Sequence, residues 1–361
     1  HQVTSGPSDR MTPQRRVAVT RLLFPVVSVI GLMTTLASEA SSVEDIIKSV
    51  TFRSWSTPSK SAYPHYVALA PDGSVWYTAS KANRVGRLDP RSGAIHEYPL
   101  TTTDCEPLGI AIDKRGDVWY AGSSAGLIGR LVPRTRKLTE YKMPDPNAVD
   151  PHALVFDARG ILWFTVEVGN FVGMLDPKKG HITLVPLPMA ESRPRDIKVD
   201  SKGTPFFTEF NTNKIGSIDP ATMRITEYLL PASDARPISL AIAEDGFIYY
   251  TDYFTGLLGR FEPRSGRFDE WLSPSGRQSK PYAIAADAHG AVWYAELGKA
   301  PQNVLVRFDP KALTMTTWTV PDSSGTISHM VARRNDELWF ADSDVGNIVR
   351  ARVVRSVRDQ R

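Results

Sequence analysis

A unit of 43 to 46 residues repeats through most of this 361-residue chain and constrains its fold more than any other feature. The clearest copy runs from Pro194 to Pro231. Its opening position recurs in register at Pro64, Pro107, Pro151, Pro194, Pro237 and Pro281, with Ile327 in the seventh place. Each unit holds four short apolar runs separated by Gly, Asn or Asp-Pro. This pattern is typical of four antiparallel strands joined by tight turns.

Two further positions keep the same register in every unit. Twelve residues after each opening position stands an aromatic side chain: Trp76, Trp119, Trp163, Phe206, Tyr249, Trp293 and Trp339. Nine residues after it stands a turn residue, which is Gly in six units and Asp336 in the last. A period in the low forties with four strands per repeat is the signature of propeller blades. We therefore predict an all-β, seven-bladed β-propeller with four-stranded blades.

The last unit lacks its fourth strand, because its pattern ends after Ile348. A matching strand stands at the other end of the repeat region, where Phe52, Trp55 and Pro58 follow the spacing of the outer strands. Pairing of this N-terminal strand with the last blade would remove the open edge of the ring. We expect the propeller to span residues 51–354. The arginines that follow Ile348 are expected to form a solvated basic tail, with residues 355–361 outside the fold.

The N-terminal segment has the composition of a secretory leader. Residues 1–10 look extraneous, and Met11 is the expected start. Arginines then precede the apolar run 22–36, and small residues end at Ala40, the expected cleavage site. Residues 41–50 would form a linker with one or two helical turns. We expect a periplasmic or secreted protein with no transmembrane anchor after processing.

Composition narrows the classes of partner and site. Much of the formal net charge of +4 comes from arginines near the two termini, so we expect no nucleic-acid partner. Cys105 is the only cysteine, which excludes a disulfide framework and a cysteine-based zinc site. We expect a monomer that binds a small molecule or peptide at the mouth of the central channel, where closed β structures favour ligand sites.

Two sets of polar residues are expected at one mouth of this channel. The first follows the opening position directly and contains His65, His152, Arg195 and Tyr282, with His329 one place late. The second stands fifteen residues after the opening position and contains Glu209, Asp252, Glu296 and Asp342. These acids would bind a ligand or a cation. Alternatively, they hydrogen-bond the backbone of a neighbouring blade, and the histidines are solvated or structural.

The third unit carries a more specific constellation. Asp150 and His152 flank Pro151, and Glu167 follows after the aromatic run, one place later than the other acids. Two carboxylates beside an imidazole are suited to hold a metal ion and to orient the ring as a general base.

The repeat follows the pattern P-x-x-I/V-x-x-D-x-x-G-x-x-W-F-T-E, continued by N-x-I-G-x-I-D-P and I-x-E-Y-x-L-P. This pattern resembles that of the streptogramin B (virginiamycin B) lyase family. The likeness covers residues 50–350. It implies a seven-bladed propeller that opens a cyclic depsipeptide by elimination across its ester bond, with a histidine base and a Mg²⁺ ion near glutamates. Asp150-Pro151-His152 with Glu167 is similar to the Glu-Pro-His signature of the family, with Asp in place of Glu.

Carried over to this chain, the resemblance implies that His152 is the base, that Asp150 and Glu167 hold Mg²⁺, and that Arg195 or Tyr282 stabilises the developing enolate. The other rim residues would contact the substrate: His65, Glu209, Asp252, Glu296, His329 and Asp342. In the lyases the signature lies in the last blade, whereas here it lies in the third. The alternative is therefore a non-catalytic periplasmic binding propeller. A metal-dependent lactonase of six blades is disfavoured by the count of seven.

Overall fold

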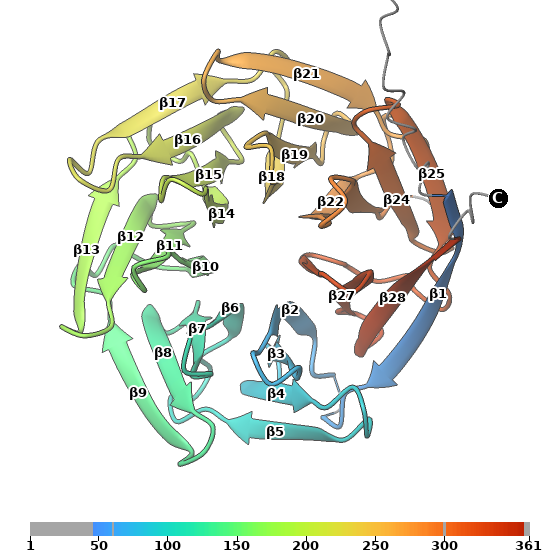
Figure 1. Cartoon of the computed structure of the whole chain (residues 1–361). Helices are drawn as coiled ribbons and strands as arrows, with labels where there is room; N and C mark the ends of the chain where they lie inside the picture. Colours follow the sequence, from blue (N-terminus) through green and yellow to red (C-terminus); the bar gives the residue numbers. More distant parts are fainter. Residues whose placement is uncertain (1–45, 60, 299–300, 357–361) are drawn as a thin grey trace, which may run out of the picture. The chain divides into compact units, whose positions relative to one another are not determined.

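A computed structural model describes residues 46–59, 61–298 and 301–356, and these form seven four-stranded antiparallel sheets around a central axis (Figure 1). In each of the first six sheets the strands follow chain order from the axis outward. The prediction of a seven-bladed β-propeller is confirmed. Within the described ranges no helix is long or apolar enough to span a membrane.

The first three blades hold the strands β2 to β13. Blade one contains β2 (Pro64–Leu69), β3 (Val75–Ala79), β4 (Arg84–Leu88) and β5 (Ile95–Pro99). Blade two contains β6 (Pro107–Ile112), β7 (Val118–Gly122), β8 (Leu127–Val132) and β9 (Lys137–Lys142). Blade three contains β10 (Pro151–Phe156), β11 (Leu162–Val166), β12 (Phe171–Asp176) and β13 (His181–Pro186).

The remaining blades continue the pattern to the end of the ring. Blade four contains β14 (Pro194–Val199), β15 (Pro205–Glu209), β16 (Lys214–Ile218) and β17 (Ile225–Leu229). Blade five contains β18 (Pro237–Ile242), β19 (Ile248–Asp252), β20 (Leu257–Glu262) and β21 (Arg267–Leu272). Blade six contains β22 (Pro281–Ala286), β23 (Val292–Glu296), β24 (Val304–Asp309) and β25 (Thr314–Thr319). Blade seven contains β26 (Met330–Arg333), β27 (Glu337–Asp342), β28 (Asn347–Ser356) and β1 (Ile46–Ser56).

The N-terminal strand closes the ring as predicted. β1 pairs with β28 in antiparallel register from Ile46 opposite Ser356 to Ser56 opposite Asn347 (Figure 1). The ring of Trp55 stacks on Trp339 with their centroids 5.4 Å apart. Because this strand begins at Ile46, residues 46–50 are not the helical turn that we expected. Residues 41–45 and the predicted leader lie outside the described residues.

The expected basic tail is part of the last blade over much of its length. β28 continues to Ser356 because β1 pairs along all of it. Its arginines are held by carboxylates: Arg352 lies 2.8 Å from Glu337, and Arg355 lies 2.8 Å from Asp336. Ion pairing within the sheet, instead of solvation, therefore places these arginines, and the prediction of a solvated tail was wrong for them.

The repeated aromatic position builds the core of the blades. All seven of these side chains are buried. Several stack on an aromatic side chain of the fourth strand, as Trp119 does on Tyr141 and Trp293 on Trp318. A glycine in the third strand admits the neighbouring ring: a Cβ at Gly129 would lie 1.9 Å from Tyr120 Cζ. This close packing explains why the repeat keeps one register around the ring.

Candidate functional site

Strand register brings the predicted residues to one mouth of the channel. In each of the first six blades the opening proline pairs with the residue fifteen places later, as Pro151 pairs with Val166 and Pro194 with Glu209. The first strand therefore begins where the second strand ends. Figure 1 shows these first strands innermost in the ring. Side chains at the start of different first strands can meet across the channel.

Arg195 connects the other predicted residues. Its Nη2 atom lies 3.4 Å from His152 Nε2 and donates a hydrogen bond of 3.1 Å to the hydroxyl of Tyr282. Its Nη1 atom lies 3.6 Å from Glu167 Oε1, and Glu167 Oε2 lies 3.5 Å from His152 Nε2. His152 and Glu167 are buried, with 3% and 6% of their surface exposed. The structure thus joins blades three, four and six in one polar cluster.

Burial and the guanidinium set the protonation of this cluster. Burial lowers the pKa of His152 well below its usual value, and the Arg195 charge lowers it further. Burial raises the pKa of Glu167, an effect that Arg195 and Arg193 oppose. His152 is therefore a neutral imidazole at physiological pH. Arg195 can only donate, so its contact with Nε2 fits the tautomer in which that atom is unprotonated.

A second group of rings lies beside His152. Tyr66 stacks on His329 with the centroids 4.3 Å apart, and its ring lies edge-on to His152 at 5.9 Å. His65 lies edge-on to His152 at 6.1 Å. Burial lowers the pKa of His65 to about 3, with Arg195 adding to the effect, and burial also places the pKa of His329 well below the usual range. These imidazoles form a neutral aromatic wall.

Several nitrogens of this site have no hydrogen-bond partner among the described residues although they are buried. They are Nε of Arg195 and the Nδ1 atoms of His65, His152 and His329. Buried polar atoms are nearly always hydrogen-bonded in native proteins. Their concentration at one channel mouth is a property of a site that receives polar groups.

The four acids of the second predicted set lie apart from this cluster. Glu209, Asp252 and Glu296 have no exposed surface, and Asp342 has almost none. Glu296 accepts from the backbone N–H of Ser275 at 3.1 Å, and Asp252 accepts from that of Arg236 at 2.9 Å.

Asp342 and Glu209 accept side-chain hydrogen bonds, from Ser323 at 2.5 Å and Thr212 at 2.9 Å. Burial raises the pKa of Glu209 to about 7, and the nearby Glu227 adds to the effect. No hydrogen bond or ion pair joins any of the four acids to His152 within the described residues. Their contacts fit the structural alternative and give no support to a substrate contact.

Among the described residues, the side chain of Asp150 forms no hydrogen bond or ion pair with His152. Its carboxylate accepts a hydrogen bond from the Ser123 hydroxyl of the neighbouring blade. Its backbone has a φ of 66°, in the left-handed region that non-glycine residues seldom adopt. Its carbonyl accepts from the N–H of Glu167 at 2.8 Å. The backbone of Asp150 therefore helps to position Glu167, whereas its side chain serves the contact between blades.

The residues present do not fit the Mg²⁺ site implied by the resemblance. Among the described residues no group of three or more His, Cys, Asp or Glu side chains is arranged to hold a metal. One carboxylate oxygen of Glu167, Oε1, faces two cations, with Arg193 Nη1 at 3.5 Å and Arg195 Nη1 at 3.6 Å, and the other, Oε2, lies 3.5 Å from His152 Nε2. A divalent ion beside Glu167 would meet two guanidinium charges, which repel it. The positive charge next to Glu167 in this structure is that of the two guanidinium groups.

Sequence reasoning missed the residues that hold the first strands in place. Thr165 Oγ1 accepts from the N–H of Ala153 at 3.1 Å and donates to the carbonyl of Arg195 at 2.7 Å. Thr251 donates in the same way to the carbonyl of Tyr282 at 2.6 Å. A threonine fourteen places after the opening proline recurs in four units and is the signal that would have revealed this contact. Tyr66 and Arg193 were also missed, since neither occupies a predicted position.

The fold is a seven-bladed propeller with a buried polar cluster at one channel mouth. Comparison with known proteins gives its family. The sequence model of the Virginiamycin B lyase family matches residues 33–204 and 178–351. The chain belongs to that family.

The similar proteins include short matches of high sequence identity and matches of the whole propeller at low identity. A virginiamycin B lyase of Bordetella parapertussis is 48% identical over 44 residues, which are 12% of this chain and 14% of that protein. The crystal structure of virginiamycin B lyase from Staphylococcus aureus superposes with a TM-score of 0.78 at 25% identity, over 85% of this chain and all of that one.

The same fold also occurs in an extracellular domain of a different protein. The extracellular domain of a one component system from B. thetaiotaomicron matches with a TM-score of 0.63 at 16% identity, over 82% of this chain and 40% of that one. This last likeness shows the fold alone.

Proposed function

We propose that the protein is a carbon–oxygen lyase that opens a cyclic ester or lactone by β-elimination at the channel mouth. The observation that carries this proposal is the buried contact of Arg195 with His152, Glu167 and Tyr282. It combines an unprotonated base, a fixed positive charge and a hydroxyl donor in one place. Membership of the Virginiamycin B lyase family supports the reaction class.

The proposed step balances without water or a redox partner. Nε2 of His152 takes the proton from the carbon next to the carbonyl. The C–H electron pair forms a carbon–carbon double bond as the bond from the β-carbon to the ester oxygen breaks. The ring opens, and the oxygen leaves as part of a carboxylate. Arg195 and Tyr282 stabilise the negative charge that develops on the substrate oxygens.

Glu167 has a role in this scheme that needs no metal. When His152 accepts the proton it becomes an imidazolium beside the positive Arg195, which is unfavourable. The Glu167 carboxylate lies 3.5 Å from Nε2 and 3.6 Å from the guanidinium, so it stabilises both cations. We assign no step to Mg²⁺.

We propose export of the protein to the periplasm or the medium, on the basis of the leader-like segment before residue 41. The ligand would be a small cyclic molecule or a peptide, and the protein would act as a monomer.

The second candidate is a binding propeller without catalysis. The specific observation in its favour is the wall of His65, Tyr66 and His329, because elimination by His152 does not require these neutral rings. They would instead pack against an apolar ligand face.

The two candidates are separated by incubating the purified protein with virginiamycin B and following the ring-opened product by mass spectrometry. We expect turnover by the wild type and a roughly 10²–10⁴-fold lower rate for His152→Ala, the usual worth of a positioned base. His96→Ala, an exposed position on β5, serves as the matched control and should leave the rate unchanged.

Absence of turnover together with ligand-induced thermal stabilisation would establish the binding candidate. Loss of turnover in His329→Ala but not in His152→Ala would place the base in blade seven.

A further inference from the structure

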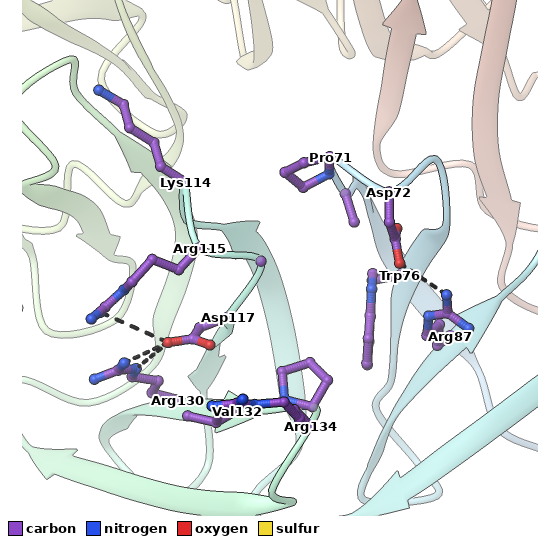
Figure 2. Close-up of a pocket in the computed structure, with 13 residues that line it drawn as sticks. Pro71, Asp72, Trp76, Arg87, Lys114, Arg115, Asp117, Arg130, Val132 and Arg134 are labelled. Atoms are coloured by element: carbon purple, nitrogen blue, oxygen red, sulfur yellow. Dashed lines mark hydrogen bonds and ion pairs between the residues drawn. The ribbon is translucent and has the colours of Figure 1, made fainter.

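A cavity of about 570 Å³ lies between blades one and two (Figure 2). The turn from β2 to β3 and the turn from β6 to β7 both line it, so it opens at the end of the first strands opposite the channel mouth. Its lining carries five cationic side chains and two carboxylates. Each carboxylate is held by an arginine: Asp72 by Arg87 at 2.9 Å and Asp117 by Arg130 at 2.5 Å.

A second cavity of about 400 Å³ adjoins it between blades two and three and shares three of its cations. Here too each carboxylate has an arginine partner. Arg159 lies 2.7 Å from Asp157, and Arg115 lies 3.6 Å from Asp113. The acids of both cavities are therefore neutralised within the protein.

Three cations remain in the two cavities after this pairing. Lys114, Arg134 and Lys178 form no ion pair with any acid in the part of the chain that the structure describes. Lys114 Nζ donates only to the backbone carbonyl of Ala158, at 2.9 Å. Figure 2 shows the Lys114 side chain extending from its turn away from Asp72, Trp76 and Arg87 of blade one. The adjoining cavities thus present uncompensated positive charge.

This charge is not a by-product of the repeat. The equivalent cavity between blades four and five has a similar volume of about 530 Å³ but the opposite sign. Its lining has two cations, Lys202 and Arg264, against four acids: Asp200, Glu244, Asp245 and Glu262. The same structural position is basic on one side of the ring and acidic on the other.

We propose that the two adjoining cavities, here called the basic groove and marked by Lys114, Arg134 and Lys178, bind an anionic polysaccharide. Positive charge distributed over two joined cavities suits an extended polyanion better than a single ion. Sulfate and carboxylate groups form charge-assisted hydrogen bonds with lysine and arginine.

The groove lacks the feature that single-stranded nucleic acids require, an exposed aromatic face on which bases stack. Of its aromatic lining, Trp76 is only 2% exposed, and the half-buried Phe156 packs edge-on against Trp119. A polysaccharide is therefore the class of ligand that the lining favours.

The test uses the full chain and measures binding to immobilised heparin and to polygalacturonate at low and high salt. The wild type should bind at least one of them and release it as salt rises, because exposed charges are screened. The triple variant Lys114→Gln, Arg134→Gln, Lys178→Gln should bind roughly 3- to 100-fold more weakly, since each exposed ion contact is worth a factor of roughly 1.4 to 5.

The matched control has the same change of net charge around the acidic cavity: Lys202→Gln, Arg224→Gln, Arg264→Gln. It should bind like the wild type. Equal loss in both triple variants would overturn the proposal, because net charge alone would then explain binding. Failure of the wild type to bind either polysaccharide would overturn it as well. Tighter binding of a single-stranded oligonucleotide would overturn the assigned ligand class.

Discussion

Two sets of polar side chains lie at the same end of the blades but make different contacts. The channel set begins the first strands, and the structural set ends the second strands. His152, Arg195 and Tyr282 begin first strands and meet across the channel. Glu209, Asp252 and Glu296 are the last residues of second strands. Each pairs with the proline that opens the first strand of its own blade. They are buried among the loops of their own blades. Position along a strand is therefore not sufficient to place a residue in the site.

The place of the acid relative to the end of the strand makes the difference, as Glu167 shows. The buried acids stand fifteen residues after the opening proline, whereas Glu167 stands sixteen residues after Pro151. β11 ends at Val166, so Glu167 is the first residue of the turn that follows and lies just beyond the position of the other acids. Glu167 reaches His152 and Arg195, and Val166 occupies the position of the structural acids.

The largest effect expected from the structural set is on stability. Glu296→Ala removes the acceptor for the N–H and the hydroxyl of Ser275, which lie 3.1 Å and 2.5 Å from the carboxylate. We expect a loss of about 1–3 kcal/mol in the free energy of unfolding, because partly buried donors remain unsatisfied. Denaturant titration measures this loss.

Glu296→Gln keeps an acceptor and is the matched control, with a smaller loss expected. A strong fall in the rate of elimination with unchanged stability would break the comparison, since Glu296 would then belong to the site.

A smaller effect is expected on the rate of elimination when the pH is varied, and it depends on His152 of the channel set. Elimination requires unprotonated His152, and a base is unprotonated above its pKa. Burial and Arg195 hold the pKa of His152 well below 6.5. The rate should therefore stay nearly constant as the pH falls through 6.5 and decline only at lower pH. With a base of ordinary pKa, about 6.5, the rate would fall roughly fivefold between pH 6.5 and 5.5.

Arg195→Gln removes one of the two main causes of the lowered pKa, so it should move the acid limb of the pH–rate profile toward 6.5. A wild-type profile with its midpoint already near 6.5 would show that His152 is not the base, or that it is solvated in the working enzyme.

Much of the fold could be predicted because blade packing leaves a periodic record in the sequence. The aromatic position gave the number of blades, and Trp55 gave the closure. The predictions for residues 46–50 and for the arginines of β28 were wrong because contacts between distant parts of the chain determine their structure. Pairing between β1 and β28 lengthens both strands, and Glu337 and Asp336 form ion pairs with the arginines. Local composition does not reveal these contacts.

The site could be predicted only to the level of its location. Spacing placed His65, His152, Arg195 and Tyr282 at one mouth, as the structure has them. The hydrogen bond of Arg195 to Tyr282 joins residues 87 positions apart, and no local pattern records it. The contacts of the acids and the hydroxyl bond of Asp150 depend on the bends at the strand ends, which spacing does not give.

The most direct test is the initial rate of virginiamycin B opening by wild type, Glu167→Gln and Glu209→Gln under identical conditions. Both variants replace a buried carboxyl group by an amide, at residues of nearly equal burial in neighbouring blades. We predict a loss of roughly tenfold or more in Glu167→Gln, because the charge that stabilises the His152 imidazolium is removed. Glu209→Gln should retain the wild-type rate within about twofold, in keeping with a role confined to stability. Equal rates in the two variants, or a greater loss in Glu209→Gln, would contradict the assignment of the site to the channel set.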